Sequence, residues 1–168
     1  KARSKARTSF WKPLLEHLPA KVRLVMVSKY LREEVEEDYS LKIPESNIRV
    51  IHNAIDTKLF QYEIKNKECR KKILSIRPFS SPKYGNDITV SAILLLSKEV
   101  WFSELQITLI GDGDDFENTV SPLRGFTNVT LEKRFLKQSE IAQIHKKFGV
   151  FLNPTRWDSQ GVSRDEAM

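Results

Sequence analysis

The sequence predicts an α/β fold in which an incomplete parallel sheet is flanked by helices. Short apolar runs of strand type alternate with helical patterns, and turns rich in Gly, Pro and Ser follow several of these runs. The chain has 168 residues and 40% hydrophobic residues, which is enough for a packed core. Because parallel sheets bind ligands outside the carboxyl ends of their strands, functional residues are expected in the turns that follow the strands.

The first predicted strand and helix lie in the amino-terminal part of the chain. Residues 24–27 form a short apolar strand, and Ser28 follows as the N-cap of a helix that carries Leu31 and Val35. A second strand is predicted at residues 48–51, after a break at a proline. The helix also presents an acid-rich face, formed by Glu33, Glu34, Glu36 and Glu37.

A second group of elements begins with a strand at residues 72–76. The loop at 77–87 is rich in Pro, Ser and Gly, and apolar residues then recur at helical spacing from Val90 to Leu96. Such a broad apolar face predicts a buried helix. Further strands are predicted at 106–110, 128–131 and 149–152.

Two more helices complete the predicted order. The helix at 139–147 has Ile141 and Ile144 facing inward, and His145 is predicted to lie on its polar surface. Another helix begins at about Val162, directly after a glycine turn. The alternation of strands and helices predicts parallel βαβ units.

The organisation predicts two unequal parts joined by a connecting segment. Residues 1–42 are interpreted as the end of one α/β domain, residues 43–71 as an interdomain segment and linker, and residues 72–168 as most of a second α/β domain. The chain begins without Met and stops inside a predicted helix, which indicates a fragment of a longer protein.

Charge and cysteine content restrict the location and the partners. The chain has 28 basic and 22 acidic residues, giving a net charge of +6. We interpret the basic excess as a solvated chain end without a binding role. The alternative is contact with anionic lipid headgroups or nucleic acid. The excess is concentrated at the amino terminus, in Lys1, Arg3, Lys5, Arg7 and Lys12.

Beside this basic end, Phe10 and Trp11 indicate either the edge of a core or a membrane-contact helix. Cys69 is the single cysteine, so the chain forms no internal disulfide. No apolar run reaches the roughly 20 residues of a membrane-spanning helix. A cytoplasmic location is therefore expected, and the alternative is a peripheral position on the inner face of a membrane.

The most informative motif occupies residues 157–168. It places the carboxylates of Asp158 and Glu166 eight positions apart around Gly161, at the start of a helix. With Asn-Pro-Thr-Arg upstream at 153–156, it resembles the carboxylate-x7-carboxylate signature of glycosyltransferase family 4, also called glycosyl transferases group 1. The family usually has Glu where this chain has Asp158.

Further matches to this family occur in order along most of the chain. Residues 51–60 resemble its interdomain sequence, with His52 and Ala54 in place of the usual Pro and Gly. Arg77 and Lys83 match the basic pair that follows the first strand of the family's nucleotide-binding domain, although here a Tyr separates Lys83 from the next glycine.

The resemblance implies a GT-B architecture of two Rossmann-like domains, of which this chain spans the end of the acceptor-binding domain and much of the nucleotide-sugar-binding domain. It implies a retaining transferase that moves a sugar from a UDP- or GDP-sugar to a glycan or glycolipid, without cofactor, metal or nucleic acid.

The resemblance also implies a role for each matching residue. Glu166 would bind the ribose hydroxyls, Asp158 the transferred sugar, and Arg77 with Lys83 the diphosphate, whose negative charge grows as the glycosidic bond breaks. The loops beside the nucleotide and sugar would be formed by Gly111, Gly113, Ser159, Gln160, Gly161 and Val162.

Metal binding is not expected, and two other functions stay open. The acidic run from Asp112 to Glu117 lacks the spacing of a calcium loop and is interpreted as the cap of a helix near Phe116. One alternative function is a GT-B phosphorylase or epimerase. The other is a non-catalytic basic module, associated with membrane or nucleic acid, that keeps a GT-B-like fold.

Overall fold

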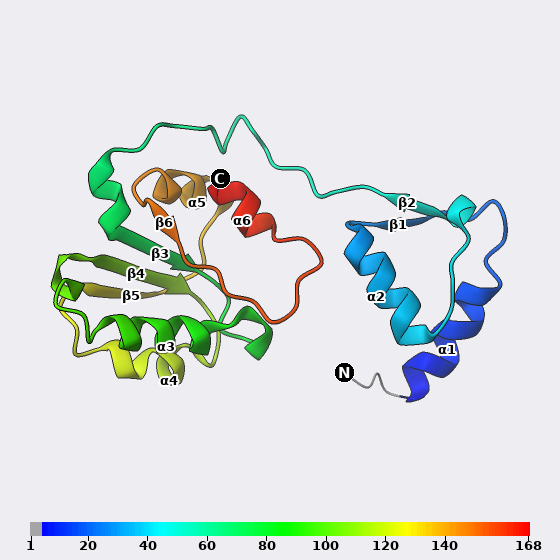
Figure 1. Ribbon diagram of the computed structural model, residues 1–168, viewed down its shortest axis with the longest axis horizontal. Helices are drawn as coiled ribbons and strands as arrows, with labels where there is room; N and C mark the ends of the chain where they lie inside the picture. The colour runs from blue at the N-terminus through cyan, green and yellow to red at the C-terminus, as the bar shows by residue number, and fades with distance from the viewer. Residues whose placement is uncertain (1–4) are drawn as a thin grey trace. The chain divides into compact units, whose positions relative to one another are not determined.

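A computed structural model describes residues 5–168, with side chains described from Ser9 onward. The chain divides into two compact units, of which the first ends at Ala54 and the second begins at Ile55 (Figure 1). This division falls inside the segment 43–71, which the sequence predicts to be the interdomain region. Each unit has its own sheet and its own core.

The first unit contains a two-stranded parallel sheet and two helices. Strand β1 (Leu24–Met26) pairs with β2 (Ile48–Val50). Helix α2 (Lys29–Tyr39) begins where predicted, because the Ser28 hydroxyl accepts a hydrogen bond from the Leu31 amide at 3.0 Å. Helix α1 (Lys5–Glu16) precedes them, and the core is formed by Leu15, Met26, Tyr39, Ile43 and Ile48.

Helix α1 has one buried and several exposed apolar residues among those described. Leu15 is buried in the core, whereas Phe10, Trp11 and Leu14 are 66%, 44% and 47% exposed. The helix therefore contributes to the edge of the core through Leu15. No helix among residues 5–168 is both long enough and apolar enough to cross a bilayer.

One glutamate of the predicted acid-rich face is buried. Glu36 accepts hydrogen bonds from Arg32, Lys42 and the Ile43 amide, at 3.2, 3.0 and 3.1 Å. Burial acts to raise its pKa, but the hydrogen bonds outweigh burial and hold the pKa below its ordinary value. Glu36 therefore ties α2 to the segment that follows it.

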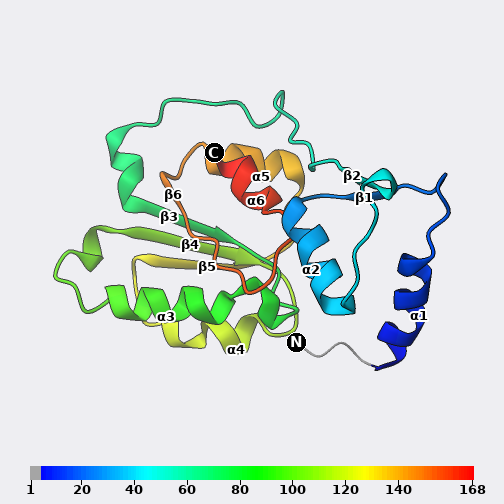
Figure 2. The same cartoon turned by 45° about the vertical axis from the view of Figure 1, so that its right-hand side comes forward.

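The second unit contains a four-stranded parallel sheet. Its strands are β3 (Lys72–Ile76), β4 (Gln106–Gly111), β5 (Val129–Lys133) and β6 (Val150–Phe151), in the order β5-β4-β3-β6 (Figure 2). All neighbouring pairs are parallel. The predicted α/β fold with parallel strands and flanking helices is thus confirmed.

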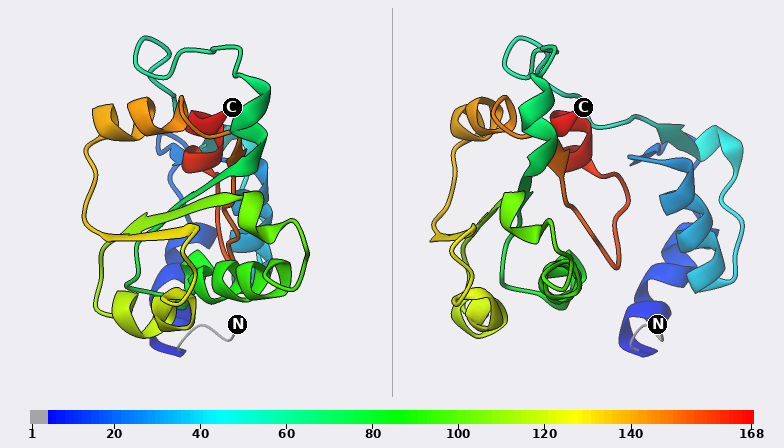
Figure 3. Two further views of the ribbon diagram at one scale, coloured as in Figure 1. Left: turned by 90° about the vertical axis from the view of Figure 1, so that its left-hand side faces the viewer. Right: turned by 60° about the vertical axis from the view of Figure 1, so that its left-hand side comes forward.

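Helices cover both faces of this sheet. Helices α3 (Asn86–Leu96) and α4 (Phe116–Val120) lie on one face, and α5 (Gln138–His145) and α6 (Val162–Ala167) lie on the other (Figure 3). Strand residues alternate between the two cores, since Leu109 packs with α3 and α4 while Ile110 packs with α5. Short 3-10 helices lie at Glu45–Asn47, Lys67–Lys71, Pro82–Tyr84, Phe102–Glu104 and Ser121–Leu123.

Two local predictions were wrong. His145 is 6% exposed and packs edge-on against the Phe151 ring, so it does not lie on a polar surface. It follows Ile141 by one helical turn and shares its inward face, which the pattern already contained. Asp115 stands at the N-cap of α4, but its side chain makes no capping hydrogen bond.

Candidate functional site

The carboxyl ends of β3 and β6 meet at the point where the chain changes face of the sheet. After β3 the chain continues to α3 on one face, and after β6 it continues to α6 on the other. We call residues 77–85 the β3 loop and residues 152–161 the β6 loop. In open parallel sheets, the crevice between two such loops is the usual ligand site.

The β3 and β6 loops are joined by hydrogen bonds. The Arg156 amide and the Thr155 hydroxyl both donate to the Lys83 carbonyl, at 2.9 and 3.1 Å. In the other direction, the Arg77 guanidinium donates to the Pro154 carbonyl at 3.3 Å. Gly85, at φ 64°, lies so close to Pro154 that a Cβ atom would be 2.9 Å from its carbonyl oxygen.

Arg77 is a buried cation at the base of these loops. It is 6% exposed and also donates to the Tyr84 carbonyl at 3.4 Å. Burial lowers the pKa of Arg77 below its ordinary value, and the carboxylate of Asp158 opposes this change. Arg77 and Asp158, both predicted site residues, are therefore brought within electrostatic reach of each other.

Lys83 is exposed, unlike Arg77. Its Nζ atom lies 4.9 Å from the centroid of the Tyr84 ring, and the Arg77 guanidinium carbon lies 5.3 Å from the same centroid. Tyr84, the residue by which the loop departs from the family spacing, thus contacts both cations.

The turn that holds Gly111 and Gly113, two of the predicted site residues, lies against the β3 loop. A Cβ atom on Gly111 would be 1.9 Å from the Arg77 carbonyl oxygen, and one on Gly113, at φ 139°, would be 2.5 Å from Phe79. The Phe79 amide donates to the Asp112 carbonyl at 2.7 Å. Both glycines are therefore required by close packing of the two turns, whatever ligand they meet.

The β6 loop leads from Asp158 into α6. Asp158 is exposed and accepts a hydrogen bond from the Gln160 amide at 3.2 Å. The Val162 amide donates to the Gln160 carbonyl at 2.9 Å. The backbone amides of Gln160 and Val162, two of the predicted loop residues, are thus bonded within the loop, and Ser159 and Gly161 lie beside them, half-buried.

Glu166 lies on α6, away from the turn that holds Asp158. Its Oε1 atom accepts a hydrogen bond from Gln138, the first residue of α5, at 3.1 Å. The bond joins α5 to α6 on one face of the sheet. Glu166 is half-buried, and its carboxylate lines a cavity.

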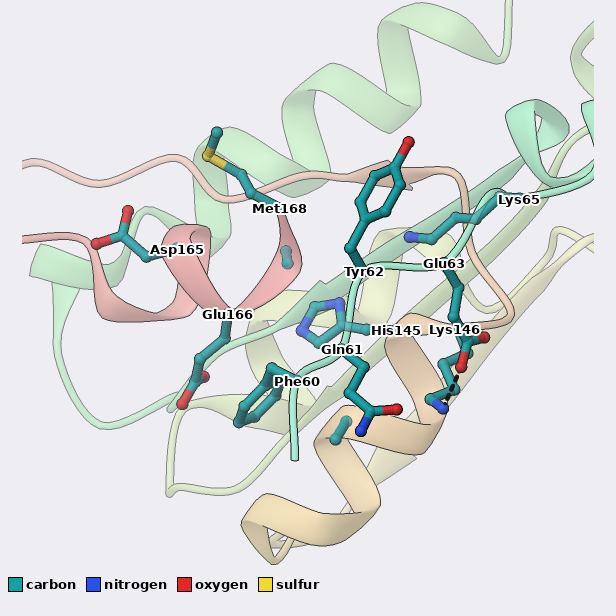
Figure 4. A pocket seen from close by; sticks show the side chains of 12 residues that line it. Phe60, Gln61, Tyr62, Glu63, Lys65, His145, Lys146, Asp165, Glu166 and Met168 are labelled. Atoms are coloured by element: carbon teal, nitrogen blue, oxygen red, sulfur yellow. Dashed lines mark hydrogen bonds and ion pairs between the residues drawn. The ribbon is translucent and has the colours of Figure 1, made fainter. Parts of the chain in front are cut away.

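This cavity of about 240 Å³ lies between α5, α6 and the segment 60–65. Figure 4 shows the imidazole of His145 among the side chains that line it. Its Nε2 atom has no hydrogen-bond partner among the residues that the structure describes. Burial, assisted by the charge of Lys65, lowers the pKa of His145 to about 4, so the ring is neutral at pH 7.

Sequence reasoning missed the pair formed by Arg156 and Asp87. The Arg156 guanidinium meets the Asp87 carboxylate through two hydrogen bonds of 2.8 and 2.7 Å, across 69 positions of sequence. No spacing rule connects residues so far apart. Within the described part of the chain, no group of three or more His, Cys, Asp or Glu side chains could hold a metal ion.

No known family profile and no curated protein sequence matches the chain. Solved structures do match it. TarM of S. aureus has a TM-score of 0.71 at 16% identity, covering 94% of this chain and 30% of TarM. Sucrose-phosphate synthase from Thermosynechococcus elongatus has a TM-score of 0.68 at 17% identity, covering 98% of this chain and 42% of the synthase.

A third structure is the pneumococcal O-GlcNAc transferase GtfA in complex with UDP and GlcNAc. Its TM-score is 0.59 at 17% identity, covering 85% of this chain and 27% of GtfA. The chain therefore spans between about a quarter and two fifths of the length of these proteins. The likeness shows that the fold is that of GT-B glycosyltransferases.

Proposed function

We propose that the chain is part of a retaining glycosyltransferase of family 4 type, and that its second unit binds a UDP- or GDP-sugar. The observation that carries this proposal is the meeting of the β3 and β6 loops at the switch point of the sheet, with Arg77, Lys83 and Asp158 gathered there. The complexes of TarM and GtfA with UDP support the choice of a nucleotide-sugar donor.

The charges of the site suit a diphosphate leaving group. When the glycosidic bond breaks, negative charge grows on the diphosphate, and fixed cations stabilise it more in the transition state than in the ground state. Lys83 is exposed and would contact the phosphates. Arg77 is buried, so it would hold the β3 loop and add positive potential without touching the phosphates. Donor binding would need no metal ion.

The two carboxylates would hold the sugars of the donor. Asp158 would accept hydrogen bonds from the transferred sugar, and Glu166 would accept them from the ribose diol, which two carboxylate oxygens suit. When the ribose binds, its hydroxyls would replace or join Gln138 as hydrogen-bond donors to Glu166. The acceptor, a glycan or glycolipid, would be bound largely by parts of the protein outside this chain.

Titration of the chain with UDP and GDP by calorimetry, with EDTA present, tests donor binding without requiring turnover. We expect one nucleotide to bind and Glu166→Ala to weaken binding by about 1–3 kcal/mol. Glu104→Ala serves as the control, because Glu104 directly precedes β4 and so lies at the amino ends of the strands, opposite the site.

Two results would count against the proposal. No binding of either nucleotide would argue for the non-catalytic module. Equal affinity of the Glu166→Ala variant and the unchanged chain would remove Glu166 from the ribose site.

A further inference from the structure

Arg156 makes four hydrogen bonds that converge on the β3 loop and the start of α3. Its amide donates to the Lys83 carbonyl at 2.9 Å, and its Nη1 atom donates to the Pro82 carbonyl at 2.8 Å. The two remaining bonds go to the Asp87 carboxylate, at 2.8 and 2.7 Å. One residue of the β6 loop thus holds two consecutive peptide groups of the β3 loop.

Asp87 gives this arrangement a rigid support. It lies in the first turn of α3, whose residues Val90 and Ile93 are buried in the main core of the unit. Hydrogen bonds from Arg156 hold the pKa of Asp87 below its ordinary value, so the carboxylate is ionised at neutral pH. Arg156 is therefore fixed to a packed helix while it grips the loop.

The partial exposure of the pair indicates that its role is geometric. The side chains of Arg156 and Asp87 are 34% and 62% exposed, and exposed ion pairs contribute little to folding stability. The planar fork of an arginine, however, orients what it binds more strictly than a lysine does. Here the fork joins the Asp87 carboxylate to the Pro82 carbonyl, while the Arg156 backbone amide holds the next carbonyl, that of Lys83.

We infer that Arg156, held by Asp87, is a positioning residue that sets the β3 loop so that Lys83 can meet the donor diphosphate. This inference rests on the proposed function. The competing role for Arg156 is direct contact with the diphosphate as a third cation. The two roles predict opposite effects of removing the Asp87 charge, because a freed and unpaired Arg156 would bind an anion more tightly.

The test is titration of the chain with UDP, or with GDP if that is the nucleotide that binds, at two salt concentrations. Positioning predicts about tenfold weaker binding for Asp87→Asn, although this change removes a negative charge near an anionic ligand. Arg156→Lys should also weaken nucleotide binding, because a lysine cannot reproduce the two-pronged contact of the arginine. The double variant Asp87→Asn/Arg156→Ala should bind no more weakly than Arg156→Ala. Unchanged or tighter binding by Asp87→Asn would overturn the inference.

Lys71→Ala is the matched control. Lys71 pairs with Glu104 at 2.7 Å at the opposite ends of the strands, so Lys71→Ala removes one positive charge from an exposed ion pair, as Arg156→Ala does. We expect its UDP affinity to equal that of the unchanged chain.

Amide hydrogen exchange separates failure of this inference from failure of the proposed function. If the unchanged chain binds neither UDP nor GDP, the proposed function fails, whereas the coupling of the loops is still measured without ligand. Asp87→Asn should speed exchange of the Arg156 amide at least fivefold, a loss that Lys71→Ala does not cause. Unchanged exchange at Arg156 in Asp87→Asn would overturn the inference.

Discussion

The four parallel strands have their amino ends at one edge of the sheet, the amino edge, and their carboxyl ends at the other, the carboxyl edge. Both edges are tightly packed, but they differ in their charges. At the amino edge, a Cβ atom on Gly149 would be 2.4 Å from the Cys69 carbonyl oxygen, and at the carboxyl edge Gly111 meets Arg77 even more closely. The ion pair at the amino edge, Lys71 with Glu104, is about half exposed. The carboxyl edge instead buries the guanidinium of Arg77 beside Asp158.

The difference shows which features of a parallel sheet point to ligand binding. Close glycines occur at both edges, so they report how tightly neighbouring turns pack. A buried cation costs desolvation energy, and a fold that keeps one uses it to hold neighbouring groups or to bind an anion. By that criterion the carboxyl edge, where Arg77 is buried and Lys83 is exposed, is the edge to test for ligand binding.

The largest expected effect is that of Gly111→Ala. The new methyl group would lie 1.9 Å from the Arg77 carbonyl oxygen, so the β4 turn and the β3 loop cannot both keep their positions. We expect a loss of about 3 kcal/mol or more in the free energy of unfolding, measured by urea denaturation. Gly125→Ala is the control, because nothing lies within 4 Å of its Cβ position.

Gly149→Ala tests whether the two edges differ in their role. It should also destabilise the unit, but the fraction that stays folded should bind UDP normally, whereas folded Gly111→Ala should bind it poorly. Equal stability of Gly111→Ala and Gly125→Ala would contradict the packing of the carboxyl edge described here.

The next effect is a dependence of stability on pH that comes from His145. Its folded pKa of about 4 lies below the ordinary value of 6.5, so the unfolded chain binds more protons between these limits. Stability should therefore fall as pH decreases from about 6.5 to 4, by up to about 3 kcal/mol. Urea unfolding at several pH values measures this slope.

His145→Leu removes the titrating ring and should flatten the slope, while His17→Gln, at an exposed site of the first unit, should leave it intact. A slope that persists in His145→Leu would assign the acid sensitivity to other groups.

The sequence predicted the elements better than the contacts between them. The strand at 72–76 and the helix that begins after Ser28 follow from apolar runs and a capping side chain, which act over a few residues. The bond between Arg156 and Asp87 depends on how β3 and β6 are paired, and local pattern does not determine that pairing.

The candidate site could be predicted only as a set of loops. The order of the strands brings Arg77 and Asp158 together, and their residue types alone do not. Burial was the weakest prediction, since Glu36 and His145 are polar residues that the pattern assigned to helix faces but the structure buries. Glu36 is buried by a hydrogen-bond set that the pattern does not contain, whereas His145 follows Ile141 on the inward face, which the pattern did contain.

A smaller effect is expected for Lys83→Ala at the carboxyl edge. Lys83 is exposed, so its removal should leave the urea midpoint nearly unchanged. Loss of a cation that meets the diphosphate should weaken UDP binding about tenfold and reduce its sensitivity to salt. Calorimetric titration at two salt concentrations measures both, and an unchanged affinity would remove Lys83 from the diphosphate site.

The smallest effect belongs to Lys71→Ala at the amino edge. The pair with Glu104 holds the Glu104 pKa below its ordinary value, yet both side chains are about half exposed and solvent screens their attraction. Neither the urea midpoint nor the UDP affinity should change measurably. If UDP affinity fell as far as in Lys83→Ala, removal of any positive charge from the second unit would be enough to weaken binding. The distinction drawn between the two edges would then be wrong.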